Sequence, residues 1–357
     1  MHNILRKGKG RQAWQVNIRL HERVMDTIYT PSNITDDIEV EMMQHLVTSS
    51  KAEGTIKTYL PVIKEWKNFA ASREFQTKPE TTEGLSRFIA RKCLEGKPLS
   101  FFNNLAPALA YNHEANGFPG TPTVHSNFIK TLLAGAKRKA AHDRSPTKKA
   151  DSLTQKQIHK ILNAVFYKPG PPNWIEWRTA LKIFVMYKSF CRWDCYSQLT
   201  KDSIIITSEY VSITFDHAKN DQFYNGSQTY LSAIPNSKFC PVKIFKRFFS
   251  LFNFKPDTVA YLNCRIRTVR KVSSALQDKQ LSYTTSLENS KALLSHLDIQ
   301  GNFSEKSFKV AGVSEAANQH VPLEDISTFG RWKNLETPLY YMNKSKKRRM
   351  EVSKAVV

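Results

Sequence analysis

The chain has 357 residues, a length typical of about two domains that each bury a core of their own. Its 53 lysines and arginines exceed its 31 aspartates and glutamates by 22, and the excess recurs along the whole chain, so a polyanion is the expected partner. No stretch approaches the roughly 20 apolar residues of a membrane-spanning helix, and MHNILRKGKGRQ lacks the apolar core of a signal peptide, which favours nucleic acid over a membrane surface. The five cysteines form no C-x-x-C pair, a pattern that favours reduced thiols in an intracellular protein and does not indicate zinc.

The first part of the chain predicts a basic arm followed by helices. Residues 1–35 mix RKGKGR with isolated apolar positions, and we assign them no fold. In residues 36–142, TIKTYLPVIKEWKNFA places apolar residues at three- and four-residue steps, and Pro61 within it predicts a kink or a boundary. Further helices are expected over TEGLSRFIARKCL, SFFNNLAPALAYNHEA and SNFIKTLLAGAKRKA, with Ser100 and Ser126 as candidate N-caps. Residues 36–142 are therefore predicted to form a small all-helical domain.

The second part predicts helices with one small sheet. Residues 143–153 are polar and basic and are read as a linker, after which Thr154 and Gln157 form a capping box that opens a helix. A second helix ends near FVMYKSFCRWDCYSQL, and then IIIT, the alternating YVSITF and QTYLSAI predict three antiparallel strands. The rest, to about residue 342, reads as short helices. The fold class is thus mainly α with a small antiparallel β-sheet, with a second domain at 154–342 and a basic tail at 343–357.

Several residues of the second domain have both a structural and a chemical interpretation. Arg192 follows a buried-looking helix, two residues before Asp194, so it is either held by that carboxylate or directed at a phosphate, which a guanidinium binds in a bidentate manner. Lys219 lies near the end of the alternating strand, where it is either solvated or a proton donor in a DNA groove. The aromatic residues of GRWKNLETPLYY are either packed side chains or include a tyrosine nucleophile.

The order of these parts resembles the tyrosine recombinases. That family has an arginine after a helix, then L-x-x-D and a strand, a hairpin lysine, an SF segment, GRW, and a tyrosine eight or nine residues later. The resemblance is closest to recombinases of DIRS, Ngaro and Crypton type mobile elements, whose SKTDQ, HSFR and LGRW look like AKNDQ, KSFK and FGRW here. It covers most of the chain, because SSKAEGTIKTYLPVIKEWKNFA and GAKRKAAHDRSPTKKADSLT are similar to the family's core-binding domain and linker. The resemblance implies a two-domain tyrosine recombinase clamp around duplex DNA, with a helical, SAM-like core-binding domain and an α+β catalytic domain.

The chemistry implied by the resemblance is covalent catalysis without a metal or another cofactor. A tyrosine hydroxyl attacks a DNA phosphodiester and forms a 3′-phosphotyrosyl link. Arg192 resembles the first phosphate-binding arginine, Lys219 the general acid, and Trp332 the later His/Trp that donates an N–H. Lys306 and Lys309 stand where the family has the His and Arg of H-x-x-R, so a two-pronged contact becomes a point charge. Loss of such a contact costs about 2–4 kcal/mol of transition-state stabilisation, which fits either a slow enzyme or an inactive one.

Two adjacent tyrosines are candidate nucleophiles. A nine-residue step from Trp332 gives Tyr341, and an eight-residue step gives Tyr340. Thr337 and Pro338 favour a helix that starts there, and neighbouring residues of a helix point about 100° apart, so only one hydroxyl can face the phosphate. The sequence favours Tyr341, because Thr337 matches the threonine-rich turn of the nine-residue pattern.

Double-stranded DNA is the expected partner, and basic residues of both domains are candidates to contact its phosphates or to remain solvated. These residues are Arg87, Arg91, Lys130, Lys137, Arg138, Arg144, Lys148, Lys149 and Arg331. The segment NKSKKRRMEVSK is compatible with a nuclear import signal, which would place the protein in the nucleus of a eukaryotic host, with a phosphate contact, or with a solvated tail. The family's members assemble as synaptic tetramers on two DNA sites, so self-association is expected, with residues 343–357 as a candidate exchanged segment.

Three functional hypotheses remain open from the sequence. The first is a site-specific recombinase or integrase that serves integration or excision of a mobile element. The second is a weakened or catalytically inactive DNA-binding protein derived from such a recombinase, motivated by Lys309. The third is relaxation of DNA in the manner of a type IB topoisomerase, which needs no second DNA partner. Covalent attachment to DNA separates the first and third from the second, and strand exchange between two duplexes separates the first from the third.

Overall fold

The structure is a computed structural model that describes residues 37–143, 150–216, 226–252, 260–269, 272–342 and 354. The chain divides into two compact units, Met1–Thr147 and Lys148–Val357. Most of the predicted basic arm and tail lie outside the described residues, as do Arg144, Lys148, Lys149 and Lys219. Over the described ranges, no helix is both long enough and apolar enough to cross a membrane.

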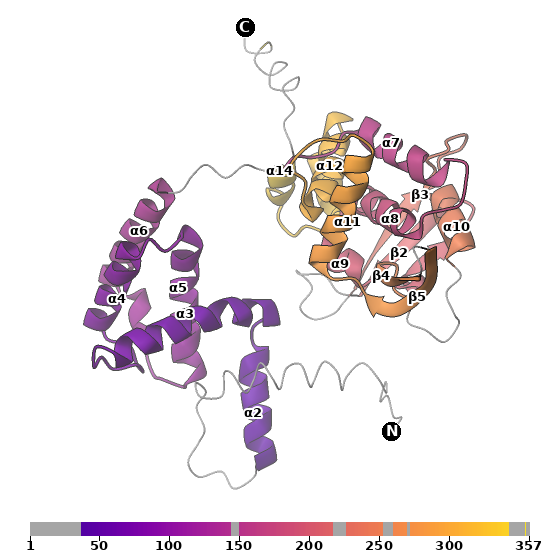
Figure 1. Cartoon of the computed structure of the whole chain (residues 1–357). Helices are drawn as coiled ribbons and strands as arrows, with labels where there is room; N and C mark the ends of the chain where they lie inside the picture. The colour runs from indigo at the N-terminus through magenta and orange to yellow at the C-terminus, as the bar shows by residue number, and fades with distance from the viewer. Residues whose placement is uncertain are drawn as a thin grey trace. The chain divides into compact units, whose positions relative to one another are not determined.

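Unit 1 is helical (Figure 1). Its elements are α2 (Asp37–Ser49), α3 (Glu53–Ala71), α4 (Thr82–Leu94), α5 (Leu99–Ala115), a short 3-10 turn (Thr123–His125) and α6 (Asn127–His142). The apolar stripe predicted on α3 faces the core of this unit, where Ile56, Ile63 and Trp66 are buried against α4, α5 and α6. The helical organisation predicted for residues 36–142 is therefore present in the structure.

Two local predictions for unit 1 need correction. The helix α3 has no boundary at Pro61, because residues on both sides of the proline are buried in the same core and their packing outweighs one lost backbone hydrogen bond; a kink there stays a prediction. The helix α5 begins at Leu99 after Pro98, so Ser100 lies inside the helix and does not cap it. The other predicted cap is confirmed, since the hydroxyl of Ser126 accepts from the backbone N–H of Ile129.

Unit 2 combines helices with two small sheets. Its elements are α7 (Gln155–Phe166), α8 (Trp174–Ser189), α9 (Trp193–Ser197), a 3-10 turn (Lys201–Ser203), β1 (Ile204–Ile206), β2 (Tyr210–Phe215), β3 (Ser227–Ser232), α10 (Pro241–Leu251), β4 (Cys264–Val269), β5 (Val272–Gln280), α11 (Tyr283–His296), α12 (Glu305–Asn318), α13 (Leu323–Phe329) and α14 (Thr337–Tyr341). The predicted capping box of Thr154 and Gln157 opens α7.

The core of unit 2 is organised around α8. This helix is buried on nearly every side and contacts α7, α10, α11, α12 and β3. The three predicted strands form one antiparallel sheet in the order β1-β2-β3, with Val211 opposite Leu231 and Ile204 opposite Ile213. The apolar side of β2 is buried, as its alternating pattern predicted.

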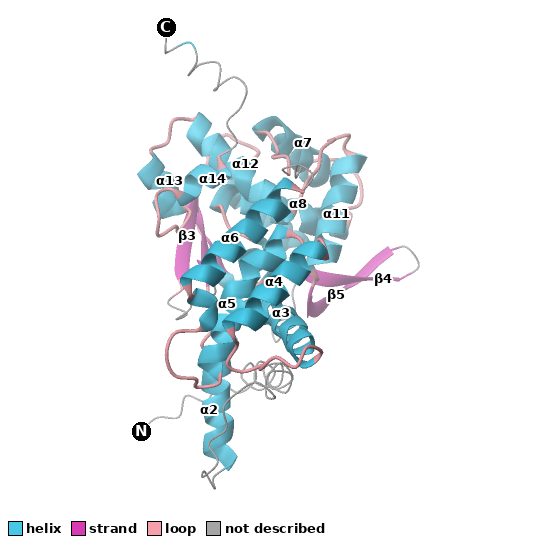
Figure 2. Cartoon of the chain, turned by 90° about the vertical axis from the view of Figure 1, so that its left-hand side faces the viewer, coloured by secondary structure: helices cyan, strands magenta, loops and turns pink. Residues whose placement is uncertain are grey.

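A second sheet, β4 paired with β5, corrects the expectation that the rest of the chain is helical. The two strands form an antiparallel hairpin that extends from unit 2 (Figure 2). On β4, Arg265 and Arg267 are exposed while Ile266 between them is half-buried. A two-stranded ribbon buries few apolar side chains, so its alternating pattern is too weak to stand out in the sequence.

Gly312 lets α12 approach α8 closely. A Cβ at this position would lie 1.9 Å from the backbone oxygen of Tyr187, which cannot move aside as a flexible side chain would. We expect Gly312→Ala to lower the free energy of unfolding by about 3 kcal/mol, because an overpacked helix contact must separate. The measurement is chemical denaturation of the whole chain.

Gly135→Ala is the matched control for this substitution. Gly135 also lies inside a helix, but a Cβ there meets no atom within 4 Å. The alanine is expected to stabilise α6 by about 0.5–1 kcal/mol, because alanine is the better helix former. Equal effects of the two substitutions would contradict the close helix contact at Gly312.

Candidate active site

Arg192 and Tyr341 meet although 149 residues separate them in the chain. The helix α8 ends at Ser189, and Phe190 takes a left-handed conformation (φ 53°) that turns the chain into α9, with Arg192 at its N-cap. The Nη2 of Arg192 donates to the hydroxyl oxygen of Tyr341 at 3.4 Å. Among the ion pairs of the described residues, none joins Arg192 to the exposed Asp194. The guanidinium is therefore available for an anion, as the chemical interpretation requires.

Trp332 packs directly against Tyr341. The two rings are stacked with centroids 5.5 Å apart, and Phe190 stacks on Trp332 at 6.5 Å. The indole is 7% exposed, and its Nε1–H has no acceptor within the part of the chain that the structure describes. A buried donor without a partner is costly, so this N–H is suited to an acceptor that arrives with a ligand.

Lys309 lies beneath the same two rings. Its side chain is 2% exposed, and its Nζ is 4.2 Å from the centroid of Trp332 and 4.8 Å from that of Tyr341. Burial, together with the nearby positive charges of Arg192 and Arg331, lowers the pKa of Lys309 to about 7. The amine therefore exchanges its proton near neutral pH, in a site that already holds the charges of Arg192 and Arg331.

Lys306 contacts the site from its rim. It lies one turn before Lys309 on α12 and is exposed, with its Nζ 5.0 Å from the centroid of the Tyr341 ring. The structure therefore brings both Lys306 and Lys309 to Tyr341, one open to solvent and one buried. An exposed ammonium remains free to contact a phosphate on a bound duplex.

The two tyrosines of α14 have different surroundings. Tyr340 is 82% exposed, whereas Tyr341 is half-buried between Trp332 and the lysines. Ser314 on α12 also donates to the backbone oxygen of Tyr341 at 3.3 Å, which fixes the end of α14. The residue that shares a site with Arg192, Lys309 and Trp332 is therefore Tyr341.

Arg331 lies in this cluster rather than on an open surface. Its Nη1 donates to the hydroxyl of Thr229 on β3, and its Nη2 donates to the backbone oxygen of Ser189 at 3.2 Å. Burial and the charge of Arg192 lower the pKa of Arg331. From the sequence, Arg331 was predicted only as one of several DNA contacts. The one sequence feature that points to a role in the site is its position between Gly330 and Trp332.

The other candidate DNA contacts that the structure describes lie on α4 and α6, which pack together. Arg87 and Arg91 are exposed and pair with acids one turn away, Glu83 on α4 and Glu95 at its C-cap. The remaining candidates have no ion pair among the described residues; they are the α6 residues Lys130, Lys137 and Arg138. A role of these side chains on DNA stays a prediction.

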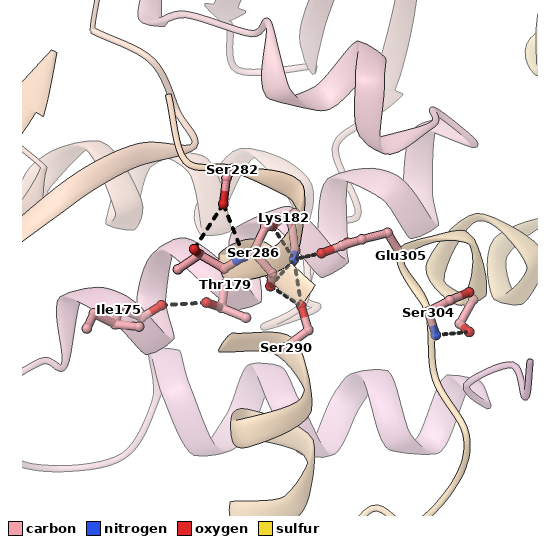
Figure 3. A network of polar contacts seen from close by, with 10 residues as sticks. Ile175, Thr179, Lys182, Ser282, Ser286, Ser290, Ser304 and Glu305 are labelled. Atoms are coloured by element: carbon pink, nitrogen blue, oxygen red, sulfur yellow. Dashed lines mark hydrogen bonds and ion pairs between the residues drawn. The ribbon is translucent and has the colours of Figure 1, made fainter. Parts of the chain in front are cut away.

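A buried polar network holds α12, and with it Lys309, against the helix that leads to Arg192. Figure 3 shows Lys182 of α8 between Glu305, the first residue of α12, and the serines of α11. Its ammonium donates to the carboxylate of Glu305 and to the hydroxyls of Ser286 and Ser290. Both charged side chains are 1% exposed. The network therefore ties together three helices inside the core.

Removing one charge of this network is expected to be far worse than removing both. Lys182→Met or Glu305→Leu alone should lower the free energy of unfolding by about 3–5 kcal/mol, because the remaining charge is buried without a partner. The double variant should recover most of that loss. Urea unfolding of the four proteins, as a double-mutant cycle, measures the coupling, and additive single effects would contradict it.

No family model matches the sequence, and no curated protein matches it. Among solved structures, the chain is similar to the XerH site-specific recombinase in a post-cleavage complex with palindromic difH substrate, with a TM-score of 0.57 and 14% identity over 95% of this chain and 94% of that one. The fold is that of the tyrosine recombinases. Two other structures are similar over most of their length, a lambda integrase dimer bound to a COC′ core site (TM-score 0.46, 13% identity, 86% and 94% coverage) and the Tn1549 transposon integrase with transposon right end DNA (TM-score 0.45, 9% identity, 96% and 99% coverage).

The tyrosine recombinase fold was predicted from motif order, and the structure places most of those motifs in one site. It unites Arg192, Lys309, Trp332 and Tyr341, with Lys306 at the rim. Over the described residues there is no group of three or more His, Cys, Asp or Glu placed to hold a metal ion.

Proposed function

We propose that this chain is a DNA recombinase that breaks and rejoins strands through a covalent link to Tyr341. The observation that carries the proposal is a tyrosine hydroxyl bonded to Arg192, with the amine of Lys309 beneath the same ring and Arg331 close to that amine. No ion pair among the described residues involves any of these three cations. Lys309 is buried and the two arginines are half-buried, so their charges are costly without a carboxylate, and a phosphodiester is an anion that would relieve that cost.

The proposed chemistry is an in-line displacement at phosphorus. The phenolic oxygen of Tyr341 forms a bond to phosphorus, the bond from phosphorus to the 5′ oxygen breaks, and a 3′-phosphotyrosyl link results. The phenol releases one proton and the leaving 5′ oxygen takes one, so the reaction needs no further reactant. Arg192 neutralises the non-bridging oxygens and the Nε1–H of Trp332 donates to one of them. Lys219, outside the described residues, is the proposed proton donor.

The wider setting of this activity is also a proposal. The motif resemblance to DIRS, Ngaro and Crypton type recombinases supports integration or excision of a mobile element. A net charge of +22 supports a duplex DNA partner, and the neighbouring recombinase structures in complex with DNA point the same way. Assembly as a synaptic tetramer and a nuclear location follow from the same resemblance and from the basic tail.

The test is covalent trapping. The whole chain is incubated with nicked duplexes that carry the ends of its own genomic locus, denatured, and examined for a protein–DNA adduct beside a recombinase of the same fold as a positive control. A denaturant-resistant adduct that protease treatment removes supports the proposal. Tight, salt-sensitive DNA binding without an adduct would overturn the proposal. It would favour the second hypothesis, an inactive DNA-binding protein, which the lysine at position 309 supports.

A further inference from the structure

Arg331 is held inside the site by three separate elements. Besides its bonds to Thr229 on β3 and to Ser189 at the end of α8, its guanidinium lies 4.2 Å from the ring centroid of Phe215 on β2. These contacts fix the plane and the direction of the group. A guanidinium has five N–H donors, and the two hydrogen bonds use two of them, so three remain for a ligand.

The backbone at Arg331 is in a conformation that costs energy for any residue with a side chain. Arg331 has a φ of +57°, in the left-handed region. The preceding Gly330 leaves room for the indole, because a Cβ there would lie 2.0 Å from the Trp332 ring. The Gly-Arg-Trp turn therefore places the Arg331 guanidinium against β2, β3 and the end of α8, and next to it an indole whose N–H has no acceptor among the described residues.

Among the described residues, no carboxylate forms an ion pair with Arg331. Burial with the charges of Arg192 and Arg331 lowers the pKa of Lys309, and burial and the charge of Arg192 lower the pKa of Arg331. Its hydrogen-bond acceptors are a hydroxyl and a backbone carbonyl, neither of which carries a charge. Arg331 is half-buried, and its charge adds to the like charges of Arg192 and Lys309.

We propose that Arg331 supplies the second planar guanidinium of the catalytic centre, beside Arg192, and that Lys309 contributes a point charge beneath the tyrosine. The inference rests on the proposed phosphodiester substrate. It explains how a chain with lysine at position 309 keeps two fork-shaped donors for the two non-bridging oxygens of the scissile phosphate. Arg331 is thereby a residue that binds the reacting group, not only a packing residue of the β3 edge.

The first readout is DNA binding, which does not require turnover. On a duplex from the chain's own locus, Arg331→Gln should reduce the slope of log affinity against log salt by about one, the value expected for one lost phosphate contact. Arg331→Lys should keep most of the slope because it keeps the charge. Arg247→Gln is the control, since it removes the same charge from α10, where the guanidinium lies over Tyr167. An unchanged slope in Arg331→Gln, with a native thermal transition, overturns the inference.

The second readout separates charge neutralisation from a packing role. A methylphosphonate at the cleavage position replaces one charged oxygen by a methyl group, so a residue that neutralises that charge becomes dispensable. Arg331→Gln is expected to slow adduct formation by about 100-fold on the phosphodiester and by less than about 10-fold on the methylphosphonate. Equal losses on both substrates would mean that Arg331 acts only through the fold.

The outcomes distinguish this inference from the proposed function. If the wild-type chain forms no adduct, the recombinase proposal fails, and the salt slope alone decides whether Arg331 contacts a phosphate. If the wild type forms an adduct and Arg331→Gln behaves alike on both substrates, the recombinase proposal stands and the inference falls. If Arg331→Gln does not fold, both measurements are made on Arg331→Lys instead, which retains the charge.

Discussion

Tyr341→Phe is expected to abolish the covalent adduct, with a loss of more than about 1,000-fold in its rate of formation, because the phenylalanine ring has no oxygen to attack phosphorus. Tyr340→Phe should leave that rate within about threefold, since its side chain is 82% exposed and lies outside the cluster. The measurement is quantitative adduct trapping over time on the nicked duplex.

The fold should survive this substitution, which makes the comparison clean. The ring of Tyr341 stacks on Trp332, and a phenylalanine ring keeps that packing. Its hydroxyl has one hydrogen bond, to Arg192 at 3.4 Å, which is long and contributes little stability. Matching thermal transitions of the two variants provide the control. An adduct that persists in Tyr341→Phe and disappears in Tyr340→Phe would reverse the proposed assignment.

Most helices and strands of this fold can be predicted from hydrophobic periodicity, because apolar stripes in helices and alternation in strands indicate which face is buried. The stripe from Ile56 to Phe69 and the alternation from Val211 to Phe215 both lie where the pattern predicts. The hairpin β4–β5 was not predicted, because it buries little apolar surface and so has no clear alternating pattern. Pro61 does not end α3, since tertiary packing overrides a local helix breaker.

The residues of the candidate site that belong to ordered motifs can be predicted from the sequence. Those whose position depends on local backbone conformation or on helix packing cannot. Helix geometry separates Tyr340 from Tyr341 in the sequence, and the structure places only Tyr341 beside Arg192. The inward turn of Arg331 depends on a left-handed residue and on the bulk of Trp332 over Gly330, which no periodic pattern encodes. The burial of Lys309 depends on α12 packing against α8, a contact made possible by a glycine one turn later.

Lys309→Met is expected to stabilise the fold while removing activity. The methionine fills a similar volume beneath the rings of Trp332 and Tyr341 without a charge to bury, so we expect a gain of about 1–3 kcal/mol in the free energy of unfolding at pH 6. Adduct formation should fall by at least about 100-fold, because a cation at the reacting phosphate is lost. Urea unfolding and adduct trapping on the same preparations measure both effects.

The gain should depend on pH in a direction that identifies the buried amine. Burial and neighbouring charge lower the pKa of Lys309 to about 7 in the folded chain, while in the unfolded chain the lysine keeps its ordinary pKa of 10.5. Between these values the unfolded chain binds more protons, so the stability of the wild type rises with pH across this window, by about 1.4 kcal/mol per pH unit at most. Below pH 7 both states are protonated and the full cost of the buried charge is present. The advantage of Lys309→Met is therefore largest at pH 6 and shrinks toward pH 10.

Lys306→Met is the matched control, because Lys306 is exposed on the same helix and has no buried charge to remove. Its stability should differ little from the wild type at any of these pH values. If Lys309→Met were destabilising at pH 6, the ammonium of Lys309 would have to have favourable partners within the folded chain. That result would contradict its proposed role in binding a phosphate. A stabilised, inactive Lys309→Met would instead indicate that the fold tolerates an unfavourable buried cation for the sake of the reaction.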